Sequence, residues 1–106
     1  MDVKIREEII KFAQKLNSTN LSPLRSGNIS LKAQNNNEEG FLITPSGKKY
    51  DSLKADDIVF VSLEGRYDEK GLQPSSEWRF HKDIYLKKAD AKAVVHAHSP
   101  HATAVS

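Results

Sequence analysis

Two histidines near the end of the chain are the residues with the clearest capacity for chemistry. His96 and His98 lie two positions apart in the stretch AVVHAHSPHATAVS. On a β-strand, residues two apart share a face and are separated by about 6.5 Å along the strand. Two imidazoles placed in this way can chelate one metal ion, and zinc is a typical partner of imidazole ligands. The alternative is a pair of strand histidines that make ordinary hydrogen bonds.

Two histidines do not complete a metal site, because a catalytic zinc usually takes three protein ligands and keeps one position open. His101 falls in a segment that is expected to begin a helix, so we expect it to face elsewhere. A metallo-β-lactamase-type site, with the pattern His-x-His-x-Asp-His, is disfavoured because Pro100 takes the place of the aspartate. Cupin sites need a glutamate shortly after the pair, and none follows. If the pair binds a metal ion, it therefore supplies only part of the site.

Three turns rich in small residues could bind an anion. Ser75 and Ser76 precede a predicted helix with Glu77 in its first turn, and helix N-terminal NH groups together with two hydroxyls suit a phosphate. An ordinary helix cap with an acidic first-turn residue is the alternative. The turns SGNIS and TPSG present the same choice between an anion site and a plain turn.

The elements that would position these residues follow from the hydrophobic pattern. Apolar residues at helical spacing predict an amphipathic helix over residues 2–16, capped by Asp2. Short β-type runs cover 29–34, 40–45 and 57–65, with hairpin loops expected at 35–40 and 64–71. Residues 74–90 favour a helix and 91–98 a strand. Ser99 and Pro100 suit the start of another helix.

This order of elements predicts an α/β or α+β sandwich. Hairpins come first and a strand–helix–strand unit follows, which favours a mixed, mainly antiparallel sheet flanked by helices. The last expected helix has no C-cap and nothing to cover it. We therefore interpret residues 1–106 as the front part of a longer single domain.

Composition narrows the classes of function. The chain has 106 residues, 38% hydrophobic and 28% charged, with a net charge of +2, which is typical of one small globular domain. Basic residues are scattered among acids, so we expect neither nucleic acid nor a membrane surface as a partner. Cysteine is absent and the N-terminus resembles no targeting signal, which favours the cytoplasm.

Four motifs in this order resemble the class II aldolase/adducin family over almost the whole chain. They are SGNIS, LITPSGKKYDSLKADDIVFVSLEG, PSSEWRFHKDIY and AVVHAHSPHATAVS. The last two are the most specific, and the resemblance is strongest to the branch that cleaves L-fuculose 1-phosphate. It implies a three-layer class II aldolase-like sandwich, one Zn²⁺ per subunit and a homotetramer.

The resemblance also implies a role for each matching residue. His96 and His98 match two of three histidine zinc ligands, and Glu77 matches the acid/base carboxylate beside the metal. The third histidine lies downstream of Ser106 in the family, as does a tyrosine given to a neighbouring subunit. Several positions match groups that hold the substrate phosphate: Asn28, Ser46, Gly47, Ser75 and Ser76.

The implied activity is zinc-dependent cleavage of a ketose 1-phosphate to dihydroxyacetone phosphate and an aldehyde. Related epimerases have an aspartate where this chain has Glu77, and related dehydratases share the zinc histidines. Adducins keep the fold without these histidines. The second hypothesis is a non-catalytic, adducin-like fragment, and stoichiometric zinc would separate it from the enzyme. His81, Trp78 and Tyr85 are interpreted as structural.

Overall fold

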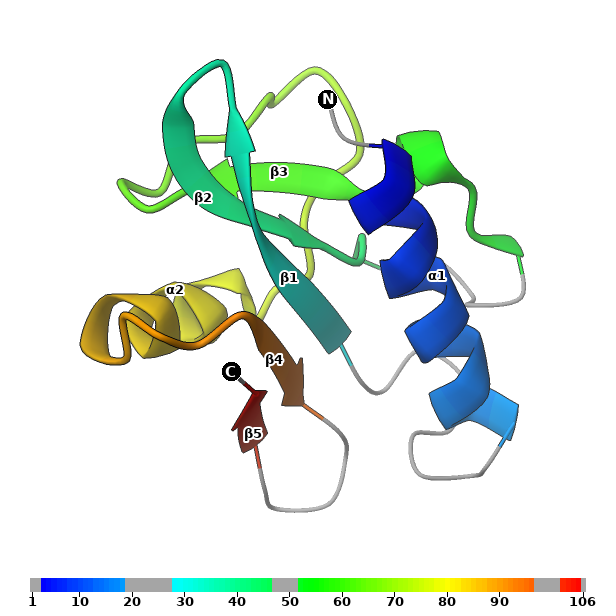
Figure 1. Ribbon diagram of the computed structural model, residues 1–106. Coiled ribbons are helices and arrows are strands. Elements are labelled where there is room, and N and C mark those ends of the chain that lie inside the picture. Colours follow the sequence, from blue (N-terminus) through cyan, green and yellow to red (C-terminus); the bar gives the residue numbers. More distant parts are fainter. Residues whose placement is uncertain (1–2, 19–27, 47–51, 97–101, 106) are drawn as a thin grey trace.

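The computed structural model describes residues 3–18, 28–46, 52–96 and 102–105, without the side chains of 16–18, 96 and 102–105 (Figure 1). Within these ranges one sheet has the strand order β3-β2-β1-β4-β5. Its strands are β1 (Asn28–Asn35), β2 (Glu38–Ile43), β3 (Val59–Ser62), β4 (Ala93–His96) and β5 (Ala102–Val105). The helices are α1 (Val3–Ser18), the 3₁₀ turn η2 (Ala55–Asp57) and α2 (Trp78–Lys87).

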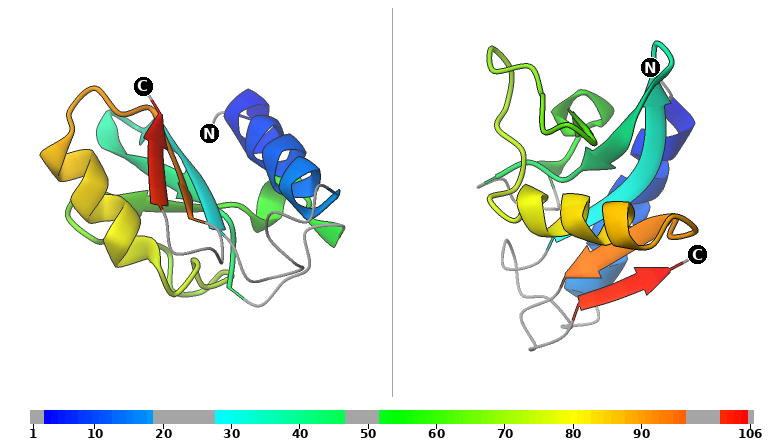
Figure 2. Two further views of the ribbon diagram at one scale, coloured as in Figure 1. Left: turned by 90° about the horizontal axis from the view of Figure 1, so that it is seen from below. Right: turned by 90° about the vertical axis from the view of Figure 1, so that its left-hand side faces the viewer.

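The two α-helices cover opposite faces of the sheet, as Figure 2 shows. Ile9 and Ala13 of α1 pack with Ile29 of β1 in one buried cluster. Tyr85 of α2 packs with Phe41 of β2 in the other. This arrangement confirms the predicted sandwich of a sheet between helices. The described strand pairings are all antiparallel, so the parallel component of the expected mixed sheet is not found among them.

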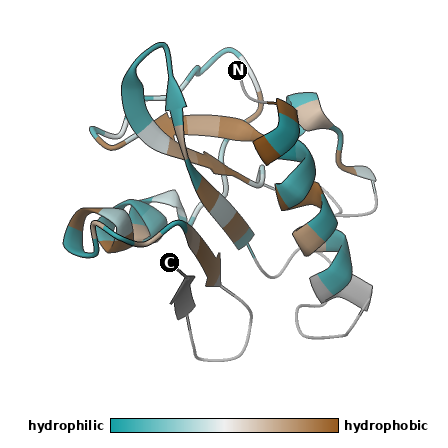
Figure 3. Cartoon of the chain, in the orientation of Figure 1, coloured by the Kyte–Doolittle hydropathy of each residue, from teal (hydrophilic) through white to brown (hydrophobic). Residues whose placement is uncertain are grey.

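Strand β1 shows how alternation places polar residues inside the protein. Ile29 and Ala33 belong to the cluster on the α1 face. They are four residues apart, and residues separated by an even number of positions share one face of a strand. Asn28 and Ser30 take the alternate positions and contact side chains of α2. Figure 3 shows hydrophobic residues in β3, in β4 and in the parts of β1 and β2 away from their hydrophilic hairpin tip, while α1 alternates hydrophilic and hydrophobic bands. Asn28 and Ser30, which belong to the site described below, thus lie on the face of the sheet that α2 covers.

The first predicted hairpin is confirmed, with Asn36 and Asn37 at its tip. Both have positive φ angles, 52° and 69°. A two-residue turn with positive φ at both central positions matches the right-handed twist of the strands, and asparagine tolerates that conformation. The hairpin fixes the register in which Ser30 lies opposite Ile43.

Two expectations about local structure are wrong. Residues 102–105, expected in a helix, form strand β5, which gives β4 an antiparallel neighbour; Thr103 and Val105 are β-branched and suit a strand. Residues 64–71 form turns without a second hairpin strand, and Gly65 donates to the Ser62 carbonyl at 2.9 Å. The predicted cap Asp2 and helix start at residues 99–101 lie outside the described residues. In the described part of the chain, no helix is long and apolar enough to span a membrane.

Candidate functional site

Four chain segments meet at one end of the sheet, which we call the site end. The register places Asn28 of β1 directly opposite His96 of β4. Beyond β2, the Thr44 amide donates to the Ile29 carbonyl at 3.1 Å. Ser75, just before α2, donates its amide to the Thr44 carbonyl at 2.9 Å. The site end therefore joins the start of β1, the end of β2, the start of α2 and the end of β4.

The segment of Ser46 is fixed to the segment before α2. Its amide donates to the Gln73 carbonyl at 2.9 Å, next to a β-bridge between Pro45 and Pro74. Ser46 itself is exposed, whereas Ser75 is buried. The structure thus brings the backbones of two predicted phosphate-binding turns together at the site end.

Glu77 is the N-cap residue of α2, so the helix begins just after it, whereas the sequence predicted Glu77 within the first turn. Its amide donates to the Ser75 hydroxyl oxygen at 3.3 Å, so Ser75 rather than Glu77 provides the local side-chain acceptor. The Glu77 side chain makes no capping hydrogen bond and is exposed, as is Ser76. A carboxylate that does not cap its own helix remains available for chemistry at this end.

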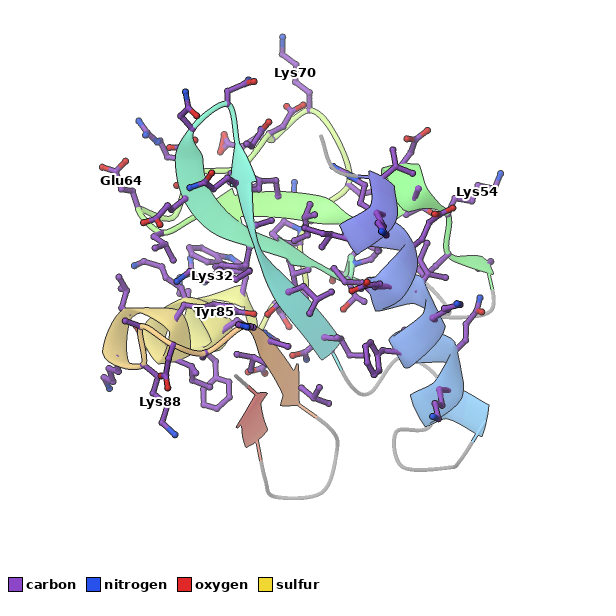
Figure 4. The ribbon with its side chains drawn as sticks, in the orientation of Figure 1. Lys32, Lys54, Glu64, Lys70, Tyr85 and Lys88 are labelled. Atoms are coloured by element: carbon purple, nitrogen blue, oxygen red, sulfur yellow. The ribbon has the colours of Figure 1, made fainter. Side chains whose placement is uncertain are left out.

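A buried polar chain lies behind the site end, between α2 and β1. His81 Nε2 bonds Asn28 Oδ1, and His81 Nδ1 lies 2.7 Å from Ser30 Oγ. Ser30 Oγ also lies 2.8 Å from the Tyr85 hydroxyl. His81 and Ser30 have no exposed surface, and Asn28 and Tyr85 are nearly as deeply buried. Figure 4 shows Tyr85 between α2 and the sheet.

Burial raises the pKa of Tyr85 far above that of a free phenol. Hydrogen bonds with Ser30 and with the Val94 backbone act in the opposite direction but do not offset the burial. The Phe41 ring stacks on Tyr85 with centroids 5.2 Å apart and helps to exclude water. Tyr85 is therefore a neutral hydrogen-bonding group at physiological pH.

Sequence reasoning missed this buried chain, since it treated His81 and Tyr85 only as structural residues. The signal was present as two polar patterns. His81 and Tyr85 are four residues apart on one helix face, and Asn28 and Ser30 are two apart on one strand face. Pairing the two patterns requires knowing that α2 packs across β1, which is a long-range contact.

The predicted metal ligands are only partly described by the structure. His96 ends β4 at the site end, but its side chain and the whole of His98 and Gly47 lie outside the described residues. Among the described side chains, no group of three His, Cys, Asp or Glu residues could hold a metal ion. Imidazole is a preferred zinc ligand, so the residue types of the predicted pair fit zinc in donor chemistry. The geometry of the pair and a shared phosphate hollow stay predictions.

A cavity of about 570 Å³ lies away from the site end, between α1, η2 and β3. Its two arginines are already engaged. Arg6 donates to the carbonyls of Ala55 and Ile58 at 2.7 Å each, and Arg66 pairs with Glu38 at 2.7 Å. We therefore take the site end, and not this cavity, as the candidate functional site.

Comparison with known proteins gives matches along nearly the whole chain. Residues 7–106 match the family model of the class II aldolase and adducin N-terminal domain. L-fuculose phosphate aldolase of Escherichia coli K12 is 42% identical over 103 residues, which are 97% of this chain and 46% of that protein. The 5-methylthioribulose-1-phosphate/5-deoxyribulose-1-phosphate aldolase of Rhodospirillum rubrum is 38% identical over 104 residues, 98% and 45% respectively.

Solved structures give the same result for the fold. An L-fuculose 1-phosphate aldolase superposes with a TM-score of 0.82 at 33% identity, covering 94% of this chain and 46% of that one. The L-fuculose-1-phosphate aldolase of Thermus thermophilus gives 0.76 at 30% identity, covering 94% and 49%. This chain thus spans about half the length of the relatives that it matches.

Proposed function

Because this chain belongs to the class II aldolase and adducin family, we propose that it forms the N-terminal part of an aldolase that cleaves a ketose 1-phosphate. A substrate such as L-fuculose 1-phosphate would give dihydroxyacetone phosphate and an aldehyde. The observation that supports this most is the meeting at the site end of Asn28, Ser75 and His96 with the helix start at Glu77. As the family resemblance implies, we also propose a homotetramer, and the cytoplasmic location stays a prediction from composition.

His96 and His98 would hold a zinc ion together with a third ligand from outside this chain. Bound there, zinc would act as a Lewis acid that stabilises negative charge on the substrate oxygens when the carbon–carbon bond breaks. Donor chemistry supports this assignment, because neutral imidazole is a preferred zinc ligand.

Glu77 would move the proton at the carbon that becomes the hydroxymethyl group of the ketone product. Its exposed carboxylate begins α2 and makes no capping bond, so it is available to exchange a proton with substrate. The phosphate would be held by the two turns and the strand start, through Asn28, Ser46, Gly47, Ser75 and Ser76. Binding remote from the reacting carbons fixes the orientation of the substrate.

A second substrate class is favoured by the similarity to the Rhodospirillum rubrum aldolase and to a 5-deoxy-D-ribulose 1-phosphate aldolase of Bacillus thuringiensis, 39% identical over 104 residues. A 5-deoxypentulose or methylthiopentulose 1-phosphate would share the phosphate and the reacting carbons. It would differ only at the aldehyde end. The choice between these substrates is therefore a matter of the aldehyde-binding residues.

The test is an aldol cleavage assay on the longest natural form of the protein, with zinc and both substrate types, that measures release of dihydroxyacetone phosphate. We expect Glu77→Gln to lower kcat by about 10²- to 10⁴-fold, the usual loss when an acid/base group is removed. Glu69→Gln, in an exposed turn, is the matched control and should keep wild-type kcat. Epimerisation without product release, or full activity in Glu77→Gln, would contradict the proposal.

A further inference from the structure

The donors and acceptors of the buried chain can be assigned from their chemistry. Asn28 Oδ1 can only accept, so the hydrogen lies on His81 Nε2. In a neutral ring Nδ1 is then an acceptor and takes the hydrogen of the Ser30 hydroxyl. Ser30 Oγ, with its hydrogen used, accepts from the Tyr85 hydroxyl. The hydrogen bonds run in one direction, from Tyr85 through Ser30 and His81 to Asn28.

Burial supports a neutral His81. The ring has no exposed surface, and the two side chains bonded to its nitrogens, Asn28 and Ser30, are uncharged, so a positive charge there would be expensive. The Tyr85 hydroxyl, 2.8 Å from Ser30 Oγ, completes the chain at its other end.

The contact between Asn28 Oδ1 and His81 Nε2 determines how the Asn28 amide is presented. While Nε2 carries the hydrogen, turning the amide over would place its NH₂ group against that N–H, and the hydrogen bond would be lost. His81 in this tautomer therefore holds the carbonyl end of the amide towards α2. The NH₂ end is left for other partners on a residue that begins β1 and lies opposite His96 at the site end.

We infer that His81 is a positioning residue, which holds the Asn28 amide so that its NH₂ group donates to a phosphate oxygen of the substrate. Ser30 and Tyr85 keep the His81 ring in the tautomer that this requires. The inference rests on the proposed function in one respect, namely that Asn28 contacts the phosphate. It adds three buried side chains, His81, Ser30 and Tyr85, which together orient the amide at the start of β1 as a hydrogen-bond donor to anions.

A double-mutant cycle with inorganic phosphate as the probe tests the inference on the purified protein. Asn28→Ala is expected to lower phosphate affinity about tenfold, the loss of one hydrogen bond to a charged group. His81→Leu should cause a similar loss, because it removes the donor at similar volume. If His81 acts through Asn28, the double variant loses no more than Asn28→Ala alone. Losses that multiply, or unchanged affinity in a folded His81→Leu protein, would overturn the inference.

A conservative variant separates positioning from simple packing. The amide nitrogen of glutamine can take the place of Nε2, so His81→Gln is expected to restore affinity to within about twofold of wild type. A histidine needed only for its volume would gain nothing from glutamine over leucine. Equal losses in His81→Gln and His81→Leu would therefore count against positioning.

The tautomer gives a readout that needs no substitution. In protein labelled with ¹⁵N-histidine, the His81 signals should show a protonated Nε2 and an unprotonated Nδ1, and Ser30→Ala should reduce that preference. A proton on Nδ1 would overturn the assigned direction. These measurements use phosphate alone, so they separate the two proposals. If phosphate binding depends on His81 but no sugar phosphate is cleaved, this inference stands and the aldolase proposal is refuted. If a sugar phosphate is cleaved but phosphate binding does not depend on His81, the aldolase proposal stands and this inference is refuted.

Discussion

At the scale of single residues, the core is unusual in containing a linked set of polar groups. Each is expensive to bury alone, at about 1–3 kcal/mol for an unsatisfied donor or acceptor. Asn28, Ser30, His81 and Tyr85 avoid this cost because each has a partner in the chain. Networks of this kind specify one arrangement of their elements, since a partial match is worse than none. The same contacts that hold α2 on β1 therefore align a candidate binding residue.

Tyr85 should make the stability of the protein fall in alkaline solution. Its pKa is raised in the folded state, so above a pH of about 10 the unfolded chain loses this proton first. The contribution is constant below that pH and is lost above it, by about 1.4 kcal/mol per pH unit for this one group. Urea unfolding at about pH 8 and about pH 11 measures the decline.

Tyr85→Phe is the comparison for this prediction. It should be less stable than wild type by about 1 kcal/mol near neutral pH, because Ser30 loses its donor. Its stability should nevertheless decline less steeply between the two pH values, since the group that titrates is gone. Parallel declines in the two proteins would show that Tyr85 does not contribute to the pH dependence.

At the scale of elements, local patterns predicted what local forces decide. The α1 periodicity, the Asn36–Asn37 turn and the strand at β3 could be predicted because propensity, spacing and turn chemistry agree there. Strand β5 could not, because Ser99 and Pro100 signal a helix start while pairing with β4 is a long-range contact. The buried chain was hidden for the same reason, whereas Glu77 and His96 were found from motifs of the family.

The β2–β3 pairing depends on a glycine at position 40. Gly40 lies opposite Ser62, and an added Cβ would come within 3.0 Å of Val61, Ser62 and the Phe60 ring. The Val61 and Ser62 atoms belong to the backbone and cannot move aside without shifting the strand. We expect Gly40→Ala to lower the free energy of unfolding by about 1–3 kcal/mol, as overpacking usually does.

Gly71→Ala is the matched control for Gly40→Ala. Its added Cβ would meet only the Asp68 carbonyl oxygen, at an ordinary contact distance of 3.9 Å. Its stability should stay within about 0.5 kcal/mol of wild type, as for most surface substitutions. Urea unfolding compares the two variants. Equal effects would mean that the close approach of β2 and β3 does not restrict position 40.

At the scale of the whole molecule, the proposed chemistry is divided between this chain and other parts of the protein. The chain covers 46% of the Escherichia coli relative but includes the strand starts, the helix start and the His-x-His pair that match the motifs of the family. Under the proposed function, this chain would offer a scaffold for phosphate binding and proton transfer. Metal binding would depend most on the remainder, because the proposed site takes its third ligand from beyond residue 106.

Zinc retention should therefore differ between this chain and a longer natural form. Two imidazoles leave more coordination positions to water than three do, so we expect the 106-residue chain to lose zinc on dialysis. A form extended by downstream sequence to the length of the relatives should keep about one zinc per subunit. In that form, His96→Ala and His98→Ala should lose the metal, whereas His101→Ala should keep it. Metal analysis after dialysis measures each protein. Stoichiometric zinc in the 106-residue chain would mean that its own residues complete the site and that Glu77, as the carboxylate nearest in the family pattern, is a ligand and not a proton carrier.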